Sequence, residues 1–181
     1  SQTICGGIST TTTSFVNSVA GGSFNYSLLN PGAIPASVTG FIGNGTGQIP
    51  GSVINNGGTN PYTLSYAVVP TASGCNGPSG TFQITVNPAA VTTFSAPNQT
   101  ICSGQNTNLV NLSSSTPNVS ISWTLPGGVP QGIVGLNPTQ GTANIPAFNS
   151  LVNNTNSPIQ ILFDAQASNV PNACIGAVAT Y

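Results

Sequence analysis

The feature that most constrains the fold of this chain is an internal repeat with a period of about 97 residues. The segment QTIC begins at Gln2 and begins again at Gln99. At the same spacing, residues 60–68 (NPYTLSYAV) correspond to residues 157–165 (SPIQILFDA). Similar segments that recur in the same order indicate tandem copies of one structural unit, and a period of this size is typical of one domain. We therefore predict two domains, residues 1–89 and residues 90–181.

Short segments in which apolar and polar residues alternate occur at equivalent places in the two copies. Such alternation predicts β-strands with one buried face. The 22 glycines and 15 prolines interrupt these segments, as turns between strands do, and no segment has the pattern and caps of a helix. The sequence therefore predicts an all-β chain. Tyr26 and Trp123 lie at equivalent positions in two of these segments, and we interpret both as core residues rather than as binding platforms.

A second pair of equivalent segments, residues 62–66 and 159–163, shows the same alternation. The residues expected to point inward are Tyr62, Leu64 and Tyr66 in the first copy and Ile159, Ile161 and Phe163 in the second. Asp164 then falls on the outward face. We interpret it as an ordinary solvated surface charge rather than as a ligand or site residue.

The near absence of charge excludes several classes of function. The chain has no Lys, Arg or His, and its one acidic residue is Asp164, whereas about 25% of residues are charged in typical globular proteins. Binding to nucleic acid needs Lys and Arg to neutralise phosphates. Acid–base catalysis and activation of a hydroxyl nucleophile both need a titratable partner group, and a calcium site needs several carboxylates. We therefore expect no enzyme activity, no cofactor, no metal and no nucleic-acid partner.

Targeting signals are also missing from the printed sequence. No stretch of 18 apolar residues is present, so we expect no membrane span. A signal peptide has a basic first region, which this sequence lacks. We expect either that a signal peptide has been removed or that the chain is a segment of a longer protein.

The four cysteines are divided equally between the two copies. Metal sites favour closely spaced Cys pairs, and a catalytic Cys needs a His, so neither role fits. We predict one disulfide within each domain, joining Cys5 to Cys75 and Cys102 to Cys174. Closing loops of this length contributes about 4 kcal/mol in the chain-entropy description, and disulfides indicate an oxidising compartment outside the cytosol. The alternative is two buried free thiols in each domain.

Several short motifs together resemble a known group of domains. These are the opening QTIC followed by Gly or by Ser-Gly, the central ISWTL segment, and the late GC followed by GTFQITVNP. They resemble the PKD-like and immunoglobulin-like repeats of Bacteroidota surface adhesins, which are associated with gliding motility and type IX secretion. The resemblance implies two tandem immunoglobulin-like (PKD-like) β-sandwich domains, an extracellular or cell-surface location, and an architectural or adhesive role. It supplies no catalytic residues. The near-total loss of charge and the missing TVNP ending of the second copy depart from the pattern.

Two hypotheses about function follow. The first is an extracellular structural protein, a subunit or repeat section of a surface fibre that assembles with itself head to tail through β-strand and edge contacts. Only Ser1 precedes the first QTIC, and no counterpart of residues 83–88 follows Tyr181, so we expect a terminal strand of one copy to complete its neighbour. The alternative is an adhesin stalk or a module that binds carbohydrate or another surface.

Overall fold

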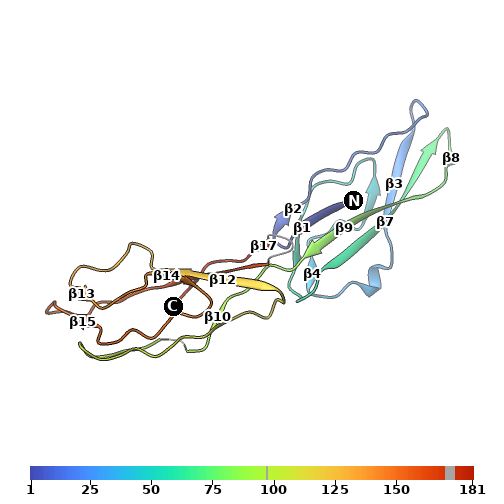
Figure 1. Cartoon of the computed structure of the whole chain (residues 1–181). Helices are drawn as coiled ribbons and strands as arrows, with labels where there is room; N and C mark the ends of the chain where they lie inside the picture. The colour runs from blue at the N-terminus through green and yellow to red at the C-terminus, as the bar shows by residue number, and fades with distance from the viewer. Residues whose placement is uncertain (97, 170–173) are drawn as a thin grey trace. The chain divides into compact units, whose positions relative to one another are not determined.

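The computed structural model describes residues 1–96, 98–169 and 174–181 (Figure 1). The chain consists of two compact units, Ser1–Ala89 and Ala90–Tyr181. Both units are built from β-strands, and the only helical element among the described residues is a single 3-10 turn, Pro31–Ala33.

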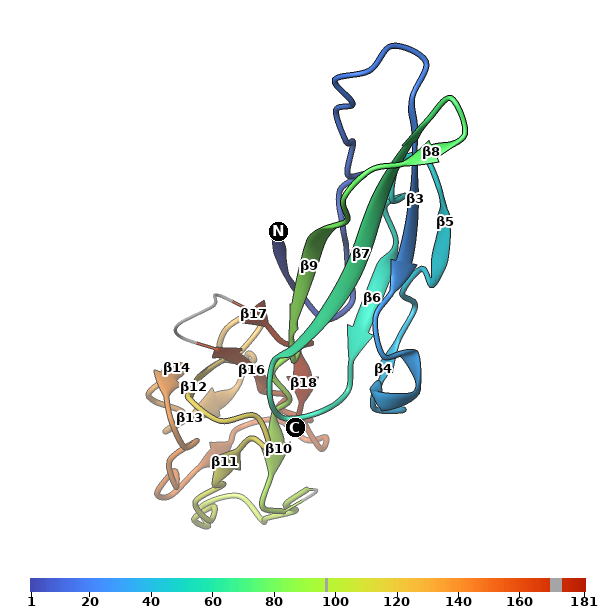
Figure 2. The same cartoon turned by 90° about the vertical axis from the view of Figure 1, so that its right-hand side faces the viewer.

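The first unit contains two sheets. The larger sheet has the strand order β1 (Gln2–Cys5), β9 (Gly80–Asn87), β7 (Tyr62–Ala72), β3 (Ser23–Leu28) and β5 (Asn44–Thr46), and β8 (Cys75–Asn76) also pairs with β7. Figure 2 shows β9, β7, β3 and β5 side by side in this sheet. The smaller sheet has the order β2 (Ile8–Ser9), β6 (Val53–Asn56) and β4 (Val38–Thr39). All pairs are antiparallel except β1 with β9, which is parallel.

The core of the first unit lies between these two sheets. The larger sheet contributes Leu64 and Tyr66 from β7 and Ile84 and Val86 from β9, all of which are buried. The smaller sheet contributes the fully buried Ile54. Two sheets whose inner faces share one apolar core form a β-sandwich.

The second unit repeats this arrangement with shorter strands. Its main sheet has the order β14 (Gln140–Thr142), β12 (Val119–Thr124), β16 (Asp164–Asn169) and β17 (Cys174–Ile175), and β18 (Ala179–Thr180) also pairs with β16. Two further strand pairs are β10 (Thr93–Phe94) with β11 (Leu112–Ser113), and β13 (Ile133–Val134) with β15 (Val152–Asn153).

The register of the strands confirms that the two units are copies of one fold. Tyr26 pairs with Gly45 in the first unit, and Trp123 pairs with Gly141 at the equivalent place in the second. Trp123 is 2% exposed, and its indole Nε1 donates a hydrogen bond of 3.0 Å to the carbonyl oxygen of Asn144. Its interpretation as a core residue is confirmed, as is that of the buried Tyr26. The predicted class, two tandem immunoglobulin-like β-sandwiches, is confirmed as well.

The structure contradicts the predicted pairing of the cysteines. Cys75 and Cys102, one from each predicted pair, are exposed free thiols, whereas Cys5 and Cys174 each take part in a disulfide. Each predicted pair thus contains one bonded and one free cysteine, so neither intradomain bond, Cys5 with Cys75 or Cys102 with Cys174, is formed.

The first unit shows why the predicted bond cannot form there. In the register of the sheet, Cys5 lies opposite Asn87, just beyond the end of β7 that begins at Tyr62. Cys75 lies opposite Ala72, at the other end of β7. The 11 residues of β7 therefore separate the two cysteines by more than about 30 Å, at the rise per residue of a β-strand. The Cα atoms of a disulfide lie within about 7 Å of each other.

Candidate strand-binding groove

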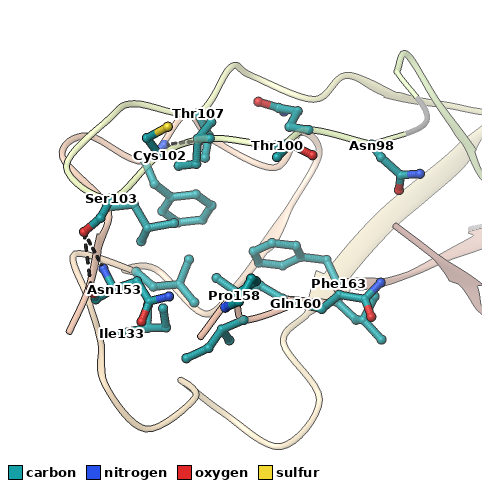
Figure 3. A pocket seen from close by; sticks show the side chains of 18 of the residues that line it. Asn98, Thr100, Cys102, Ser103, Thr107, Ile133, Asn153, Pro158, Gln160 and Phe163 are labelled. Atoms are coloured by element: carbon teal, nitrogen blue, oxygen red, sulfur yellow. Dashed lines mark hydrogen bonds between the residues drawn. The ribbon is translucent and has the colours of Figure 1, made fainter. Parts of the chain in front are cut away.

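The second unit has an open groove of about 920 Å³ between two stretches of chain. Residues 98–103 form one wall, and residues 155–163 form the other. Figure 3 shows Asn98, Thr100 and Cys102 along one side, facing Pro158, Gln160 and Phe163 across the open space. The floor consists of buried core side chains, which are Val110, Leu136, Ile145, Phe148 and Leu151. We refer to this recess as the groove.

The equivalent place in the first unit is filled by a strand. By the repeat, residues 99–102 correspond to β1, and residues 159–163 correspond to the first part of β7. In the first unit β9 lies between β1 and β7 and pairs with both. Its Ile84 and Val86 side chains are buried in the core. The groove of the second unit therefore lies where β9 lies in the first.

In the second unit, Ala179, Thr180 and Tyr181 occupy only the first part of the space that corresponds to β9. β18 pairs with β16, as the first residues of β9 pair with β7. The backbone of Tyr181 then exchanges hydrogen bonds of 2.9 and 3.0 Å with Phe163, which matches the pairing of Phe82 with Tyr66 in the first unit. The ring of Tyr181 packs against Phe94, with ring centroids 5.3 Å apart. The groove corresponds in position to Gln83 and the residues after it in the first unit.

The backbone on both sides of the groove is not part of any sheet. Residues 99–101 and 159–162 belong to no strand within the described ranges. Their backbone groups also form no hydrogen bond with another described backbone group. Unpaired rows of N–H and C=O groups are the feature that lets a sheet edge accept a further strand. The two walls of the groove therefore offer such rows on both sides of one space.

One polar side chain of the groove has an informative counterpart in the first unit. The amide Nδ2 of Asn56 donates to the carbonyl oxygen of Asn60 at 2.9 Å and to that of Val86 in β9 at 2.8 Å. Its equivalent, Asn153, lines the groove, and its Nδ2 donates to the carbonyl oxygen of Ser157 at 2.9 Å. The bond that Asn56 makes to β9 has no equivalent at Asn153 among the described residues.

The structure also places the other residues that the sequence singled out. Cys102 lies on the wall of the groove as a free thiol. Asp164 lies in β16, is partly exposed, and accepts a hydrogen bond of 2.7 Å from Thr180 Oγ1, so it has a structural partner and does not line the groove. In the described part of the chain, no group of three or more His, Cys, Asp or Glu side chains could hold a metal ion. No helix in that part has the length and apolar character needed to cross a membrane.

One comparison with known proteins agrees with the fold of the first unit. Residues 2–90 match the profile of the PKD-like domain family. The crystal structure of DIP-gamma IG1+IG2 aligns with a TM-score of 0.38 at 8% identity, over 99% of this chain and 90% of that one. A structure of the tandem Ig repeats of Dlar aligns with a TM-score of 0.23 at 13% identity, over 99% of this chain and 91% of that one. No curated protein matches the sequence.

The family match supports a PKD-like domain in the first unit. A disulfide and a domain of this class fit an extracellular or cell-surface protein, because disulfides persist in oxidising compartments. Tandem domains of this kind also fit an adhesion or stalk-type module.

Proposed function

We propose that this chain, whose first unit is a PKD-like domain, is a structural section of an extracellular surface fibre. In this proposal, neighbouring copies join through β-strand contacts, and the protein has no catalytic activity and needs no cofactor. The groove is the place in the second unit at which such a contact forms.

The observation that carries the proposal is the contrast between the two units. In the first, β9 fills the space between β1 and β7 and buries two side chains there. In the second, the same space is open along residues 98–103 and 155–163 and reaches core side chains. Apolar surface at the floor of such a groove gains free energy when it is covered. A strand in this place adds backbone hydrogen bonds, as in β-strand addition.

The composition of the chain also supports self-association. Soluble proteins discourage edge-to-edge pairing with Lys and other charged residues on edge strands. This chain has no Lys or Arg and a formal net charge of −1, so its strand edges lack that protection. A net charge near zero promotes association, and contacts between uncharged groups depend little on salt.

Two measurements on the purified chain test the proposal. We expect sedimentation velocity to show concentration-dependent oligomers, and negative-stain imaging to show linear assemblies. The distribution should change little between low and high salt, because screening acts on charges. A chain that stays monomeric at every concentration and salt condition would contradict the proposal.

One observation favours a second function, binding of carbohydrate. The groove has the volume of an ordinary ligand site, and its walls carry the amides of Asn98 and Gln160 above an apolar floor. Amide side chains can form hydrogen bonds with sugar hydroxyls. Specific hits on a glycan array from a monomeric chain would favour this adhesin function over the fibre.

A further inference from the structure

We propose that the two free cysteines join copies of this chain covalently, through a disulfide between Cys102 of one copy and Cys75 of the next. Both are exposed free thiols, and they lie in different units of the chain. This inference rests on the proposed function in taking the chain as a section of a fibre, and it adds a covalent contact to the strand contacts proposed above.

Cys102 has the same local structure as Cys5, which takes part in a disulfide. The N–H of Gly7, two residues after Cys5, donates to a carbonyl oxygen of β6 at 2.9 Å. The N–H of Gly104, two residues after Cys102, donates at 2.8 Å to Leu151, the equivalent residue of the second unit. The two glycines have φ angles of 86° and 85°. Cys102 therefore occupies a backbone position at which this fold forms a disulfide.

Cys75 has the same relation to Cys174, which also takes part in a disulfide. Cys75 lies opposite Ala72 at the end of β7, and Cys174 lies opposite Asn169, the equivalent residue at the end of β16. The residue after each cysteine continues the pairing in the same way. The position of Cys75 is therefore also one at which this fold forms a disulfide.

The free and the bonded cysteines are complementary. In the first unit Cys5 is bonded and Cys75 is free, and in the second unit Cys102 is free and Cys174 is bonded. The bonded set and the free set thus each contain one cysteine of either position. The two positions are more than about 30 Å apart in the first unit, so that unit cannot join its own two positions.

Both free thiols lie beside tight turns with open space around them. Cys75 follows a two-residue turn between β7 and β8 whose residues both have positive φ, as in the tightest hairpins, and Figure 2 shows this hairpin at one end of the first unit. Cys102 lies on the wall of the groove (Figure 3). A Cβ atom added at Gly74 or Gly104, beside these cysteines, would meet nothing within 4 Å. The Cα atoms of a disulfide must come within about 7 Å of each other, and exposed turns permit this approach.

A second copy of this chain is the partner that these observations favour. Each copy brings one free thiol of either position, so a head-to-tail contact uses every free thiol, and such contacts generate chains or rings. A formal net charge of −1 per copy gives little repulsion between copies. Exposed thiols of this kind form disulfides between molecules in oxidising compartments.

The bond forms by exchange with a small disulfide such as oxidised glutathione. The Cys102 thiol loses its proton, and its Sγ attacks one sulfur of glutathione disulfide, so that one glutathione leaves and takes up a proton. The Cys75 thiol of the next copy then loses its proton and attacks Cys102 Sγ, and the second glutathione leaves in the same way. Two protein thiols are oxidised to one disulfide, and one glutathione disulfide is reduced to two thiols.

Oxidation of the full chain tests this inference. The purified monomer is incubated with oxidised glutathione at increasing protein concentrations and is then separated by electrophoresis without reductant. We expect a ladder of dimers and longer oligomers that increases with protein concentration and is lost when dithiothreitol is added. Mass spectrometry after chymotrypsin digestion should find Cys75 linked to Cys102; trypsin is unsuitable because the chain has no Lys or Arg.

Two matched variants identify the positions that pair. Cys75→Ser and Cys102→Ser each keep one of the two thiols, so each alone should lose the ladder, whereas an equal mixture of the two should give dimers and nothing longer. Absence of a ladder from the original chain would overturn the inference. So would a monomer without free thiols, which would place the bond within one chain, or dimers as abundant from one variant alone as from the mixture.

The double variant Cys75→Ser/Cys102→Ser separates this inference from the proposed function. If the original chain gives no ladder and the double variant still forms oligomers, strand contacts join the copies and the inference alone fails. If the original chain gives the ladder but the double variant stays monomeric at every concentration, the inference stands and the strand contacts fail. A ladder together with oligomers of the double variant supports both.

Discussion

The role of β9 in holding the first unit together can be measured by the same substitution in both units. Asn56 is 5% exposed and forms three hydrogen bonds, to the carbonyl oxygens of Asn60 and Val86 and from the N–H of Gly58. Asn153 forms the equivalent bonds to Ser157 and from Thr155 but not the bond to β9. Asn153 Oδ1 also accepts a bond of 2.7 Å from Thr155 Oγ1. The pair Asn56→Ala and Asn153→Ala therefore compares a buried contact with β9 with exposed local bonds.

The expected magnitudes follow from burial. A hydrogen bond contributes about 0.5–1.5 kcal/mol net, and a buried group left without a partner costs about 1–3 kcal/mol. The bond from Asn56 to Val86 is buried, so we expect Asn56→Ala to lower the free energy of unfolding of the first unit by about 3 kcal/mol. The bonds of Asn153 are exposed, so we expect Asn153→Ala to lower that of the second unit by only about 1 kcal/mol.

The two units can be followed separately in one denaturation experiment. Trp123, the one Trp of the chain, lies in the second unit, so its fluorescence follows the unfolding of that unit. Three of the four tyrosines, Tyr26, Tyr62 and Tyr66, lie in the first unit, so near-UV circular dichroism of Tyr mainly follows the other. Equal losses for the two variants, or a larger loss for Asn153→Ala, would refute the role assigned to the contact with β9.

Three further predictions concern other parts of the two units. Gly141→Ala should lower the free energy of unfolding of the second unit by about 1–3 kcal/mol, because the new Cβ would lie 2.9 Å from a ring carbon of Trp123; an unchanged fluorescence midpoint would contradict this. Burial, with a smaller contribution from Tyr26, raises the pKa of Tyr66 from 10.0 to about 12. The free energy of unfolding of the first unit should therefore stay constant below pH 10 and fall by about 2–3 kcal/mol as the pH rises to 12. Tyr66→Phe should lack this fall, and an identical pH profile for the variant would show that another group is responsible. The free thiols of Cys75 and Cys102 should both react with a thiol reagent in the folded chain, and fewer than two reactive thiols per chain would contradict the structure.

Much of the fold could be predicted from the sequence because the repeat and the alternation of residues are local signals. The shared position of Tyr26 and Trp123 predicted two core aromatic residues, and both are buried opposite a glycine. The cysteine pairing could not be predicted in this way. It depends on where each Cys lies along a strand, and spacing in the sequence did not show that Cys5 and Cys75 lie at opposite ends of one sheet. The groove was foreseen only as a missing counterpart of residues 83–88, and the role of Asn153 needs the three-dimensional contacts of Asn56.

The clearest difference between expectation and structure concerns residues 159–162, and it has a physical explanation. Their alternation predicts a strand, yet the structure has none there. In the first unit the sheet partner of the equivalent residues 62–65 is β9, because β3 pairs with β7 from Tyr66 onward. Apart from β9, their backbone has one hydrogen bond, from the Leu29 N–H to the carbonyl oxygen of Ser65. A strand is stabilised by its neighbours more than by its own propensity, so residues 159–162 have the sequence of a strand but lack its partner. If a donated strand binds in the groove, these residues should become part of the sheet, and their amide protons should then gain protection from hydrogen exchange.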